Sequence, residues 1–320
     1  MTIKNKSILS ITPIDHIKDV RRQLSKTCNV NVLPDPSTKK VEKEIHKYDA
    51  IFTNPNKSNV FIGAQILRKA KKLKVIATAS TGTNHIDLNY AKKSKIKVIS
   101  LKKELKVINK ISSTAEHALA LTLASIRNLT VSNKSVLKGE WDYTKFIGNQ
   151  MNFLTVGVIG FGRLGRKYAK YCKSLGSKVI FFDPYKISGS NKIKKVSKIT
   201  KLLKISDVIS LHVHLDKKTH HLVNKFFLKK VKKNIILINT ARGDVVDEKA
   251  LINFLKKNKK SKYATDVIEN EIFSKKNNKL INYAKKNQRQ VLITPHIGGM
   301  TVEAQELAYN FVAKKLVNYL

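Results

Sequence analysis

Cysteine, acidic residues and long apolar runs are all scarce in this sequence, and each scarcity excludes a class of protein. The only cysteines are Cys28 and Cys172, too few for a disulfide scaffold or a four-cysteine zinc site. No run of about 18 apolar residues occurs, so we predict no transmembrane helix. The first residues lack the apolar stretch and the small-residue cleavage site of a secretory signal. We therefore expect a cytoplasmic protein with free thiols.

The shortage of acidic residues leaves the chain strongly basic. Asp and Glu together number 22 against 63 Lys and Arg, which gives a formal net charge of +41. Such a charge attracts anions, including nucleic acid. The lysines are nevertheless spread along the whole chain, in short pairs such as Lys71 and Lys72 on the polar faces of helical patterns. No zinc-finger spacing or RNA-binding aromatic motif accompanies them. We interpret the charge as general lysine enrichment and do not expect a nucleic-acid partner.

The arrangement of apolar runs predicts an α/β protein. Hydrophobic residues make up 42% of the 320 residues, and this length suggests about two domains. Short β-rich runs alternate with helical runs over residues 7–101 and again over 152–296, as in parallel sheets covered by helices. Between the two series, residues 108–130 predict one long helix, in which Ser113 and Glu116 have the capping-box spacing. A final amphipathic helix is predicted over residues 301–320.

A glycine-rich turn opens the second series. Gly160, Gly162 and Gly165 in VGVIGFGRLGR have the G-x-G-x-x-G spacing. They stand between an apolar run and a helical pattern that closes at Gly176. Such glycines allow a tight turn, the approach of a pyrophosphate to the backbone, and close packing of helix on strand. Asp183 ends the next apolar run, and its carboxylate would accept hydrogen bonds from ribose hydroxyls and repel a 2′-phosphate. NAD is therefore predicted over NADP.

Three candidate catalytic side chains follow later apolar runs. Arg242, Glu271 and His296 can converge because the carboxyl ends of parallel strands line one crevice. A guanidinium binds a carboxylate with two hydrogen bonds, an imidazole transfers the hydroxyl proton, and a carboxylate stabilises the imidazolium. Singly, each residue has a structural alternative: Arg242 could pair with Asp244 or Asp247, Glu271 could be a solvated acid, and His296 could be a core residue. Their joint occurrence favours hydride exchange between nicotinamide and a 2-hydroxy or 2-keto acid.

Eight segments together resemble the D-isomer-specific 2-hydroxyacid dehydrogenase family, in its D-3-phosphoglycerate dehydrogenase-like branch. They cover most of residues 75–305 in the family's order: STGTNHIDL, STAEHALALTLASIRN, GEWD, VGVIGFGRLGR, DPY, SDVISLHVHL, NTARGDVVDEKAL and TPHIGG. The resemblance implies two flavodoxin-like or Rossmann-like domains with parallel sheets, NAD as the cofactor, and usually a homodimer to which the 108–130 helix contributes. It also implies an NAD-binding domain at 108–298, inserted into a substrate domain formed by 1–107 and 299–320.

The resemblance further implies roles for individual residues. Arg242 would orient the substrate carboxylate and carbonyl, and His296 would be the acid and base. The motif count from Asp266 makes Glu271, rather than the nearby Glu269, the partner of His296. The implied cofactor-binding residues are Thr81, Gly160, Gly162, Arg163, Leu164, Gly165, Asp183, Val213, Thr240, Ala241 and Asp266, the last holding the nicotinamide carboxamide. The implied substrate-binding residues are Thr81, Gly82 and Arg242.

Departures from the family pattern bear on the substrate. Ile272 stands where Pro usually follows the catalytic Glu, and Asn54, Asn56 and Lys57 replace arginines of many members that act on phosphoglycerate. Lys57 is a candidate for meeting a substrate phosphate. We predict 3-phosphoglycerate as the leading substrate, with glycerate or hydroxypyruvate, glyoxylate and lactate-type acids as alternatives. No C-terminal regulatory domain is expected after Leu320.

Two alternatives concern other classes of function. His212 and His214 share one face of a predicted strand, but no third ligand accompanies them, so no metal site is predicted. Some relatives of the fold are NAD-sensing binding proteins, and the basic charge would suit a nucleic-acid partner for such a protein. The complete set of Arg242, Glu271 and His296 favours the enzyme, because a pure binding protein need not keep it.

Overall fold

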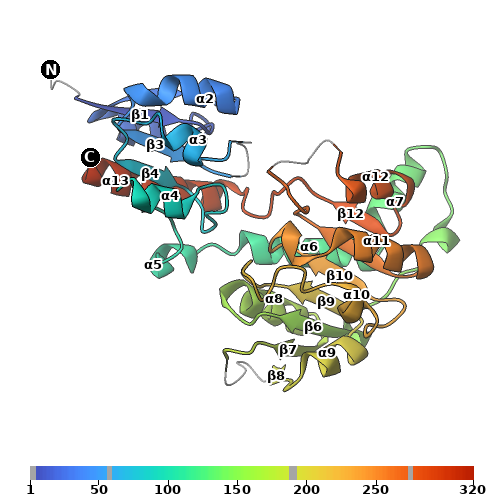
Figure 1. Cartoon of the computed structure of the whole chain (residues 1–320). Coiled ribbons are helices and arrows are strands. Elements are labelled where there is room, and N and C mark those ends of the chain that lie inside the picture. Colours follow the sequence, from blue (N-terminus) through green and yellow to red (C-terminus); the bar gives the residue numbers. More distant parts are fainter. Residues whose placement is uncertain (1–4, 56–59, 187–192, 273–276) are drawn as a thin grey trace. The chain divides into compact units, whose positions relative to one another are not determined.

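The computed structural model describes residues 5–55, 60–186, 193–272 and 277–320. The chain forms two compact units, Met1–Ile111 with Gly299–Leu320 and Ser112–Gly298, so both ends of the chain belong to the first unit (Figure 1). Residues 108–111, expected in the inserted domain, belong to the first unit. Among the described residues, no helix combines the length and the apolar character needed to cross a bilayer.

The first unit is built on a five-stranded parallel sheet. Its strand order is β2-β1-β3-β4-β5, the flavodoxin-like order. The strands are β1 (Lys6–Ser10), β2 (Cys28–Val32), β3 (Ala50–Thr53), β4 (Val75–Thr78) and β5 (Lys97–Ile99). The helices are α1 (Val20–Ser25), α2 (Thr38–Glu44), the 3₁₀ helix η1 (Ile45–Lys47), α3 (Ala64–Leu67), α4 (Leu88–Lys93), α5 (Leu105–Ile108) and α13 (Val302–Tyr319). Alternate strand residues face two separate cores: Leu9 and Ile51 pack in the core with α2, α3 and α4, whereas Ile8 and Phe52 pack in the core with α1 and α13.

The second unit is built on a seven-stranded parallel sheet. Its order is β12-β11-β10-β9-β6-β7-β8, so the strand order reverses at β6, as in dinucleotide-binding folds. The strands are β6 (Thr155–Ile159), β7 (Lys178–Phe182), β8 (Lys194–Lys195), β9 (Val208–Leu211), β10 (Ile236–Asn239), β11 (Lys262–Thr265) and β12 (Val291–Ile293). The helices are α6 (Ser113–Ile126), α7 (Leu129–Val136), η2 (Tyr143–Phe146), η3 (Met151–Phe153), α8 (Arg163–Ser174), α9 (Ile199–Ile205), α10 (Lys225–Leu228), η4 (Gly243–Val245), α11 (Glu248–Lys257) and α12 (Lys279–Lys286). The predicted α/β class with two parallel sheets is confirmed.

Helices cover both faces of this second sheet. Val156 and Val158 of β6 pack in one core with residues of α6 and α8, whereas Ile159 packs in a core with residues of α9 and α11. The alternation follows from the two-residue period of a strand, and it explains why the strands are apolar throughout. Gly157 brings α9 close to β6, because a Cβ on this glycine would lie 2.6 Å from Leu202 Cδ2.

The predicted single helix over residues 108–130 is wrong. The chain forms three helices here, α5, α6 and α7. The break between α6 and α7 lies at Asn128, which has the left-handed φ of 57°. Its side-chain amide donates to the carbonyls of Phe146 at 3.2 Å and Ile147 at 3.3 Å. Because these acceptors lie at the end of η2, about 18 residues later in the chain, a local pattern could not reveal the break.

The predicted capping box is also wrong. The N-cap of α6 is Ser112, whose side chain forms no cap hydrogen bond, so Ser113 is already inside the helix. Within the described residues, the buried Oγ of Ser113 has no hydrogen-bond partner. By contrast Gly176 adopts the left-handed φ of 85° just after α8, as predicted for a helix-closing glycine.

Candidate functional site

The glycine turn between β6 and α8 has the shape that a dinucleotide phosphate requires. Gly160 has a φ of 88°, and a Cβ on it would lie 2.5 Å from the carbonyl oxygen of His212. A Cβ on Gly165 would lie 2.1 Å from the carbonyl oxygen of Gly160, so α8 can start this close to β6 only with glycine. A Cβ on Gly162 would meet nothing within 4 Å. The first turn of α8 carries no side-chain cap, so its N–H groups suit an anion.

Asp183 lies directly after β7 and closes the same turn. One carboxylate oxygen accepts the backbone N–H of Phe161 at 2.8 Å, and the other accepts that of Tyr185 at 2.8 Å. The side chain is buried, with 8% of the residue exposed. A carboxylate has about four lone-pair sites, so capacity remains for ribose hydroxyls. The bonds to the turn itself were not predicted. Asp183 therefore both shapes the turn and suits the ribose.

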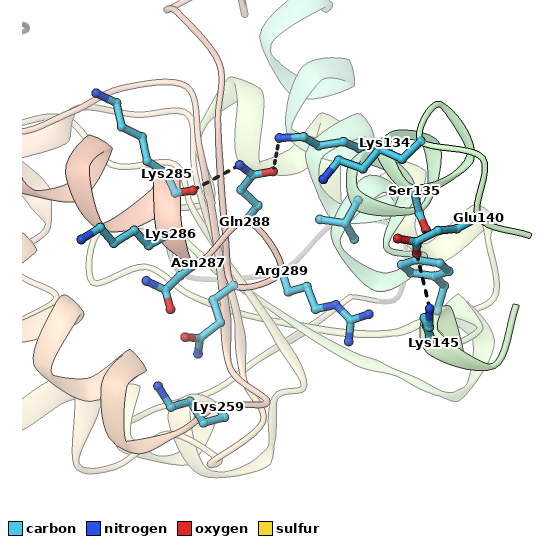
Figure 2. A pocket seen from close by; sticks show the side chains of 14 residues that line it. Lys134, Ser135, Glu140, Lys145, Lys259, Lys285, Lys286, Asn287, Gln288 and Arg289 are labelled. Carbon is cyan, nitrogen blue, oxygen red and sulfur yellow. Dashed lines mark hydrogen bonds and ion pairs between the residues drawn. The ribbon is translucent and has the colours of Figure 1, made fainter. Parts of the chain in front are cut away.

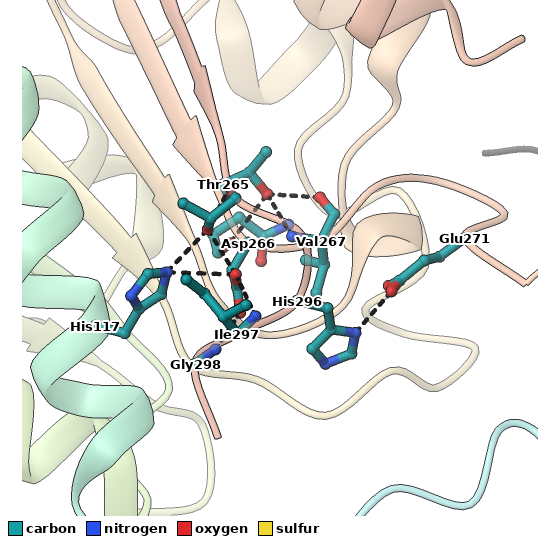
Figure 3. A network of polar contacts seen from close by, with 10 residues as sticks. His117, Thr265, Asp266, Val267, Glu271, His296, Ile297 and Gly298 are labelled. Atoms are coloured by element: carbon teal, nitrogen blue, oxygen red, sulfur yellow. Dashed lines mark hydrogen bonds and ion pairs between the residues drawn. The ribbon is translucent and has the colours of Figure 1, made fainter. Parts of the chain in front are cut away.

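His296 and Glu271 form a hydrogen-bonded pair at the carboxyl ends of the strands. The distance between His296 Nδ1 and Glu271 Oε1 is 2.7 Å, and both side chains keep 21% of their surface exposed (Figure 3). His296 has a left-handed φ of 58°, a conformation that non-glycine residues adopt only where their surroundings hold them. The pair places a carboxylate against the imidazole, where its negative charge would stabilise the protonated ring.

Glu269, the alternative partner, belongs to a different pair that the sequence did not reveal. Its carboxylate lies 2.6 Å from His221 Nε2. Its backbone N–H donates to Glu248 Oε1 at 2.8 Å, and the His221 N–H donates to the carbonyl of Asp244 at 2.9 Å. The loop that carries Glu271 is thus tied to the segment after Arg242. The two acids so close in sequence were the only available signal of a second pair.

Arg242 lies between β10 and η4, and the two acids that could neutralise it are used elsewhere. Asp247 caps α11 by accepting the N–H of Ala250 at 2.9 Å, and Asp244 accepts the N–H of Asn270 at 3.4 Å. The guanidinium donates to the carbonyl of Ala241 at 2.6 Å. Burial lowers the pKa of Arg242, and the negative charge of Glu271 opposes this change. A desolvated guanidinium of this kind suits a ligand carboxylate.

Asp266 anchors the turn that holds His296. Its oxygens accept the Thr294 hydroxyl at 2.6 Å and the N–H groups of Ile297 at 2.8 Å and Gly298 at 2.7 Å (Figure 3). His117 Nε2 of α6 lies 3.3 Å from the same carboxylate. Burial alone would raise the pKa of Asp266, but these hydrogen bonds, led by that of His117, outweigh it and lower the pKa. The sequence predicted a contact of Asp266 with the nicotinamide carboxamide but not these hydrogen bonds to the turn. His117 was not predicted as a site residue, because the helical pattern around it gave no reason to assign it a role beyond helix packing.

The remaining predicted cofactor residues lie at the ends of strands or at the start of α8. Val213 follows β9, and Arg163 and Leu164 begin α8. Thr240 and Ala241 follow β10. The Oγ1 atom of Thr240 is buried and has no hydrogen-bond partner among the described residues. An unpaired buried hydroxyl is costly unless a ligand completes it. Together with the glycine turn and Asp183, this atom indicates that the residues present fit a dinucleotide.

The predicted substrate residues of the first unit lie in the loop after β4. Thr81 and Gly82 follow this strand, and the Ser80 hydroxyl donates to the Gly82 carbonyl at 2.6 Å. Asn54 is buried and donates to the carbonyl of Ala79 at 3.1 Å. Lys57, the candidate for a substrate phosphate, lies outside the described residues, as does Asn56.

The two histidines considered for a metal have different surroundings. His212 Nε2 lies 2.9 Å from Ser210 Oγ, and its Nδ1 is buried without a partner in the described part of the chain. His214 is exposed. Within residues 5–55, 60–186, 193–272 and 277–320, no three His, Cys, Asp or Glu side chains are grouped as metal ligands.

His212 predicts a specific loss of stability in acid. Desolvation lowers its pKa to about 3 in the folded chain, whereas in the unfolded chain it titrates near the usual value of about 6.5. The unfolded state therefore binds the extra proton first, and stability falls as the pH drops from that value toward 3. Because the side chain is half-buried, we expect a loss of roughly 2 kcal/mol between pH 7 and pH 4.5. Urea unfolding of the wild type and of His212→Gln at both pH values measures it. An equal loss in the variant would contradict the assignment.

Comparison with known proteins identifies what this architecture is similar to. Residues 119–298 match the family described as "D-isomer specific 2-hydroxyacid dehydrogenase, NAD binding domain". A D-3-phosphoglycerate dehydrogenase of Archaeoglobus fulgidus is 36% identical over 90% of this chain and 53% of its own length. A glyoxylate reductase of Thermococcus litoralis is also 36% identical, over 81% of this chain and 77% of its own. The chain spans about half the length of the phosphoglycerate dehydrogenases that it matches.

A solved structure resembles the whole fold. The D-lactate dehydrogenase of Aquifex aeolicus, complexed with NAD and lactic acid, superposes with a TM-score of 0.83 at 30% identity. The match covers 98% of this chain and 95% of that protein.

Proposed function

The chain belongs to the D-isomer specific 2-hydroxyacid dehydrogenase family, and we propose that it transfers hydride between NAD and C2 of a small 2-hydroxy or 2-keto acid. The observation that carries the proposal is the pair of His296 Nδ1 and Glu271 Oε1, 2.7 Å apart. The pair lies at the carboxyl ends of the strands, as does the partly buried Arg242. The matched domain is the NAD-binding domain of the family, so NAD is the cofactor.

The proposed mechanism assigns one task to each side chain. The nicotinamide, when bound, supplies or accepts the hydride. His296 gives a proton to the carbonyl oxygen during reduction and removes it from the hydroxyl during oxidation. Glu271 holds the imidazole through Nδ1 and stabilises its protonated form. Arg242 binds the substrate carboxylate and thereby orients the reacting carbon.

Asp266 and the first unit have supporting tasks in the proposal. Through its bonds to the backbone of Ile297 and Gly298, Asp266 maintains the left-handed conformation of His296. Its predicted contact with the nicotinamide carboxamide stays part of the proposal. Thr81 and Gly82 are proposed to offer backbone N–H groups to the substrate carboxylate.

Among the candidate substrates we place 3-phosphoglycerate first, because two relatives with 36% identity are named D-3-phosphoglycerate dehydrogenase. Hydroxypyruvate or glyoxylate reduction is the alternative, since relatives named for these activities reach 35–36% identity, and D-lactate dehydrogenation is a further one. Initial rates of NADH oxidation with 3-phosphohydroxypyruvate, hydroxypyruvate, glyoxylate and pyruvate test the proposal. Turnover of at least one acid supports it and ranks the candidates. No turnover of any of them, by protein that binds NADH, would overturn it.

The glycine turn offers a matched pair of variants for cofactor binding. Gly165→Ala places a Cβ against the Gly160 carbonyl, so we expect it to destabilise the fold by roughly 1–3 kcal/mol. Gly162→Ala meets no atom within 4 Å, so we expect unfolding free energy to change by less than about 0.5 kcal/mol. The added methyl group nevertheless occupies the approach to the α8 N-terminus, and NADH binding should weaken about tenfold. Urea unfolding and NADH fluorescence titration measure both. Wild-type NADH affinity in Gly162→Ala would contradict the assignment.

A homodimer is proposed from large apolar side chains left exposed in the segment that follows α7, residues 137–153. Trp141 is 90% exposed, Tyr143 83%, Leu137 79% and Phe153 79%. Large apolar side chains left this exposed are typical of protein interfaces. Light scattering after gel filtration should give the mass of a dimer for the wild type and of a monomer for a Leu137→Ser and Trp141→Ser double variant. A monomeric wild type at micromolar concentration would refute this.

The proposal also covers the cellular location and the absence of a nucleic-acid partner. The free, buried thiols of Cys28 and Cys172 support a reducing, cytoplasmic location. No nucleic-acid partner is proposed. If the protein retained DNA at physiological salt and turned over no keto acid, the alternative of an NAD-sensing binding protein would be favoured.

A further inference from the structure

A basic cavity lies in the second unit, next to the exposed apolar residues Leu137 and Trp141 and apart from the candidate catalytic residues. It has a volume of about 540 Å³ and is lined by α7, the segment that follows it up to Phe146, Lys259, and the segment from Lys285 to Gln290 (Figure 2). Lys259 precedes β11, and Gln290 precedes β12. Asp266 and His296 instead follow these strands. Because the strands are parallel, the basic cavity lies at the amino ends of the sheet and the candidate catalytic residues at the carboxyl ends.

The cavity concentrates positive charge beyond the general lysine enrichment. Lys and Arg supply 7 of its 14 lining residues, against 63 of 320 in the chain. Glu140 is its single acid. That carboxylate already accepts hydrogen bonds from Ser135 at 2.6 Å and Lys145 at 3.4 Å. The ion pairs of the described residues include none for Lys134, Lys138, Lys259, Lys285, Lys286 or Arg289.

Contacts with uncharged groups also hold the walls of the cavity in place. Lys134 Nζ donates to Gln288 Oε1 at 2.9 Å and so joins α7 to the opposite wall (Figure 2). The guanidinium of Arg289 lies 5.4 Å from the ring centre of Phe146, a cation–π distance. The buried side chain of Gln290 donates to three carbonyls, those of Leu255, Asn258 and Ser261. These contacts hold Lys134, Arg289 and the backbone at Gln290 in place around the cavity.

The positive field extends behind the cavity wall. Lys262 is partly buried, and its ammonium donates to the Ser125 carbonyl and to Asn128 Oδ1, each at 2.6 Å. Burial lowers its pKa, and the neighbouring charge of Arg289 lowers it further. Several like charges around one concave surface repel one another, and, among the described residues, the carboxylates of Glu140 and Asp142 pair with only one of these cations, Lys145. A ligand with several negative charges would relieve this repulsion.

We propose that the basic cavity binds a small polyphosphate, a chain of linked phosphates such as inorganic triphosphate or the triphosphate of a nucleotide. A single phosphate carries too little charge for a site with one acid and seven cations. A linked chain presents several acceptor oxygens to ammonium and guanidinium donors at once. The volume of about 540 Å³ falls in the range of small-molecule sites.

Isothermal titration of inorganic triphosphate into the 320-residue chain, at about 0.15 M salt, tests the proposal. We expect one saturable site per chain that orthophosphate at the same concentration does not occupy. ATP as a second titrant distinguishes the sources: equal affinity for both means that the phosphates alone are recognised, and tighter binding of ATP means that a nucleotide is the ligand.

Matched variants separate the cavity from the overall charge. Lys134→Ala with Arg289→Ala should weaken triphosphate binding at least tenfold. Lys92→Ala with Lys93→Ala on α4 removes the same charge from the first unit and should change affinity less than twofold. Lys286→Glu, at an exposed position, repeats the test if the first pair reduces the melting temperature. If triphosphate binding did not saturate, or if the α4 variant lost as much affinity as the cavity variant, the proposal would be overturned. Any binding would then be non-specific attraction to the positive charge of the chain.

Discussion

Replacement of His296 by alanine is expected to lower kcat for keto-acid reduction by roughly 10³-fold, the usual contribution of a positioned acid or base. Nδ1 of the imidazole lies 2.7 Å from Glu271 Oε1. Removal of the imidazole deletes the proton donor but leaves the glycine turn and Asp183 intact. NADH affinity should therefore stay within about a factor of two. Steady-state rates with the best keto acid, together with NADH fluorescence titration, measure both quantities.

The two acids of the same loop provide the control for this experiment. Glu271→Gln removes the charge that faces His296, and we expect kcat to fall by about 10- to 100-fold, with a changed pH profile. Glu269→Gln removes the same charge two residues away, where the partner is His221, and should cost less than about threefold. Equal losses in the two variants would show that the loop as a whole, and not the His296 pair, matters. Unchanged turnover in His296→Ala would exclude this residue as the acid.

Replacement of Arg242 by alanine is expected to raise KM for the keto acid by about 10²-fold or more, since two charge-assisted hydrogen bonds to a carboxylate each contribute roughly 1.5–3 kcal/mol. The wild-type guanidinium is partly buried, and this burial lowers its pKa, so water replaces it poorly. Arg242→Lys keeps the charge but loses the planar two-donor geometry, and it should recover only part of the affinity.

The readout for Arg242 must separate binding from folding. The guanidinium donates to the Ala241 carbonyl, so urea unfolding of each variant should accompany the kinetics. A larger KM with unchanged unfolding free energy would support the assignment. If Arg242→Ala kept the wild-type KM, Arg242 would not bind the substrate, and other groups would have to bind the substrate carboxylate.

Local geometry explains why much of the fold could be predicted. The alternation of apolar runs with helical patterns follows from backbone periods of two and 3.6 residues, and it predicted both parallel sheets. The glycine turn was equally readable, because Gly160 needs its φ of 88° and Gly165 its missing Cβ. The predicted 108–130 helix failed where a residue of one segment, Asn128, bonds to carbonyls of another, those of Phe146 and Ile147.

The candidate site also has features that the sequence determines and features that only the tertiary structure determines. The residue types of Arg242, Glu271 and His296, and their positions after strands, are properties of the sequence, and they determined the kind of chemistry. The family resemblance implied that Glu271 is the partner of His296, but only the tertiary structure showed the contact and paired Glu269 with His221, since these pairs join residues 25 and 48 positions apart. It also decided that Asp266 holds the backbone of residues 31 and 32 positions away. Backbone preferences act between neighbours along the chain, whereas a hydrogen bond between distant side chains exists only once packing has brought their strands to one edge of a sheet.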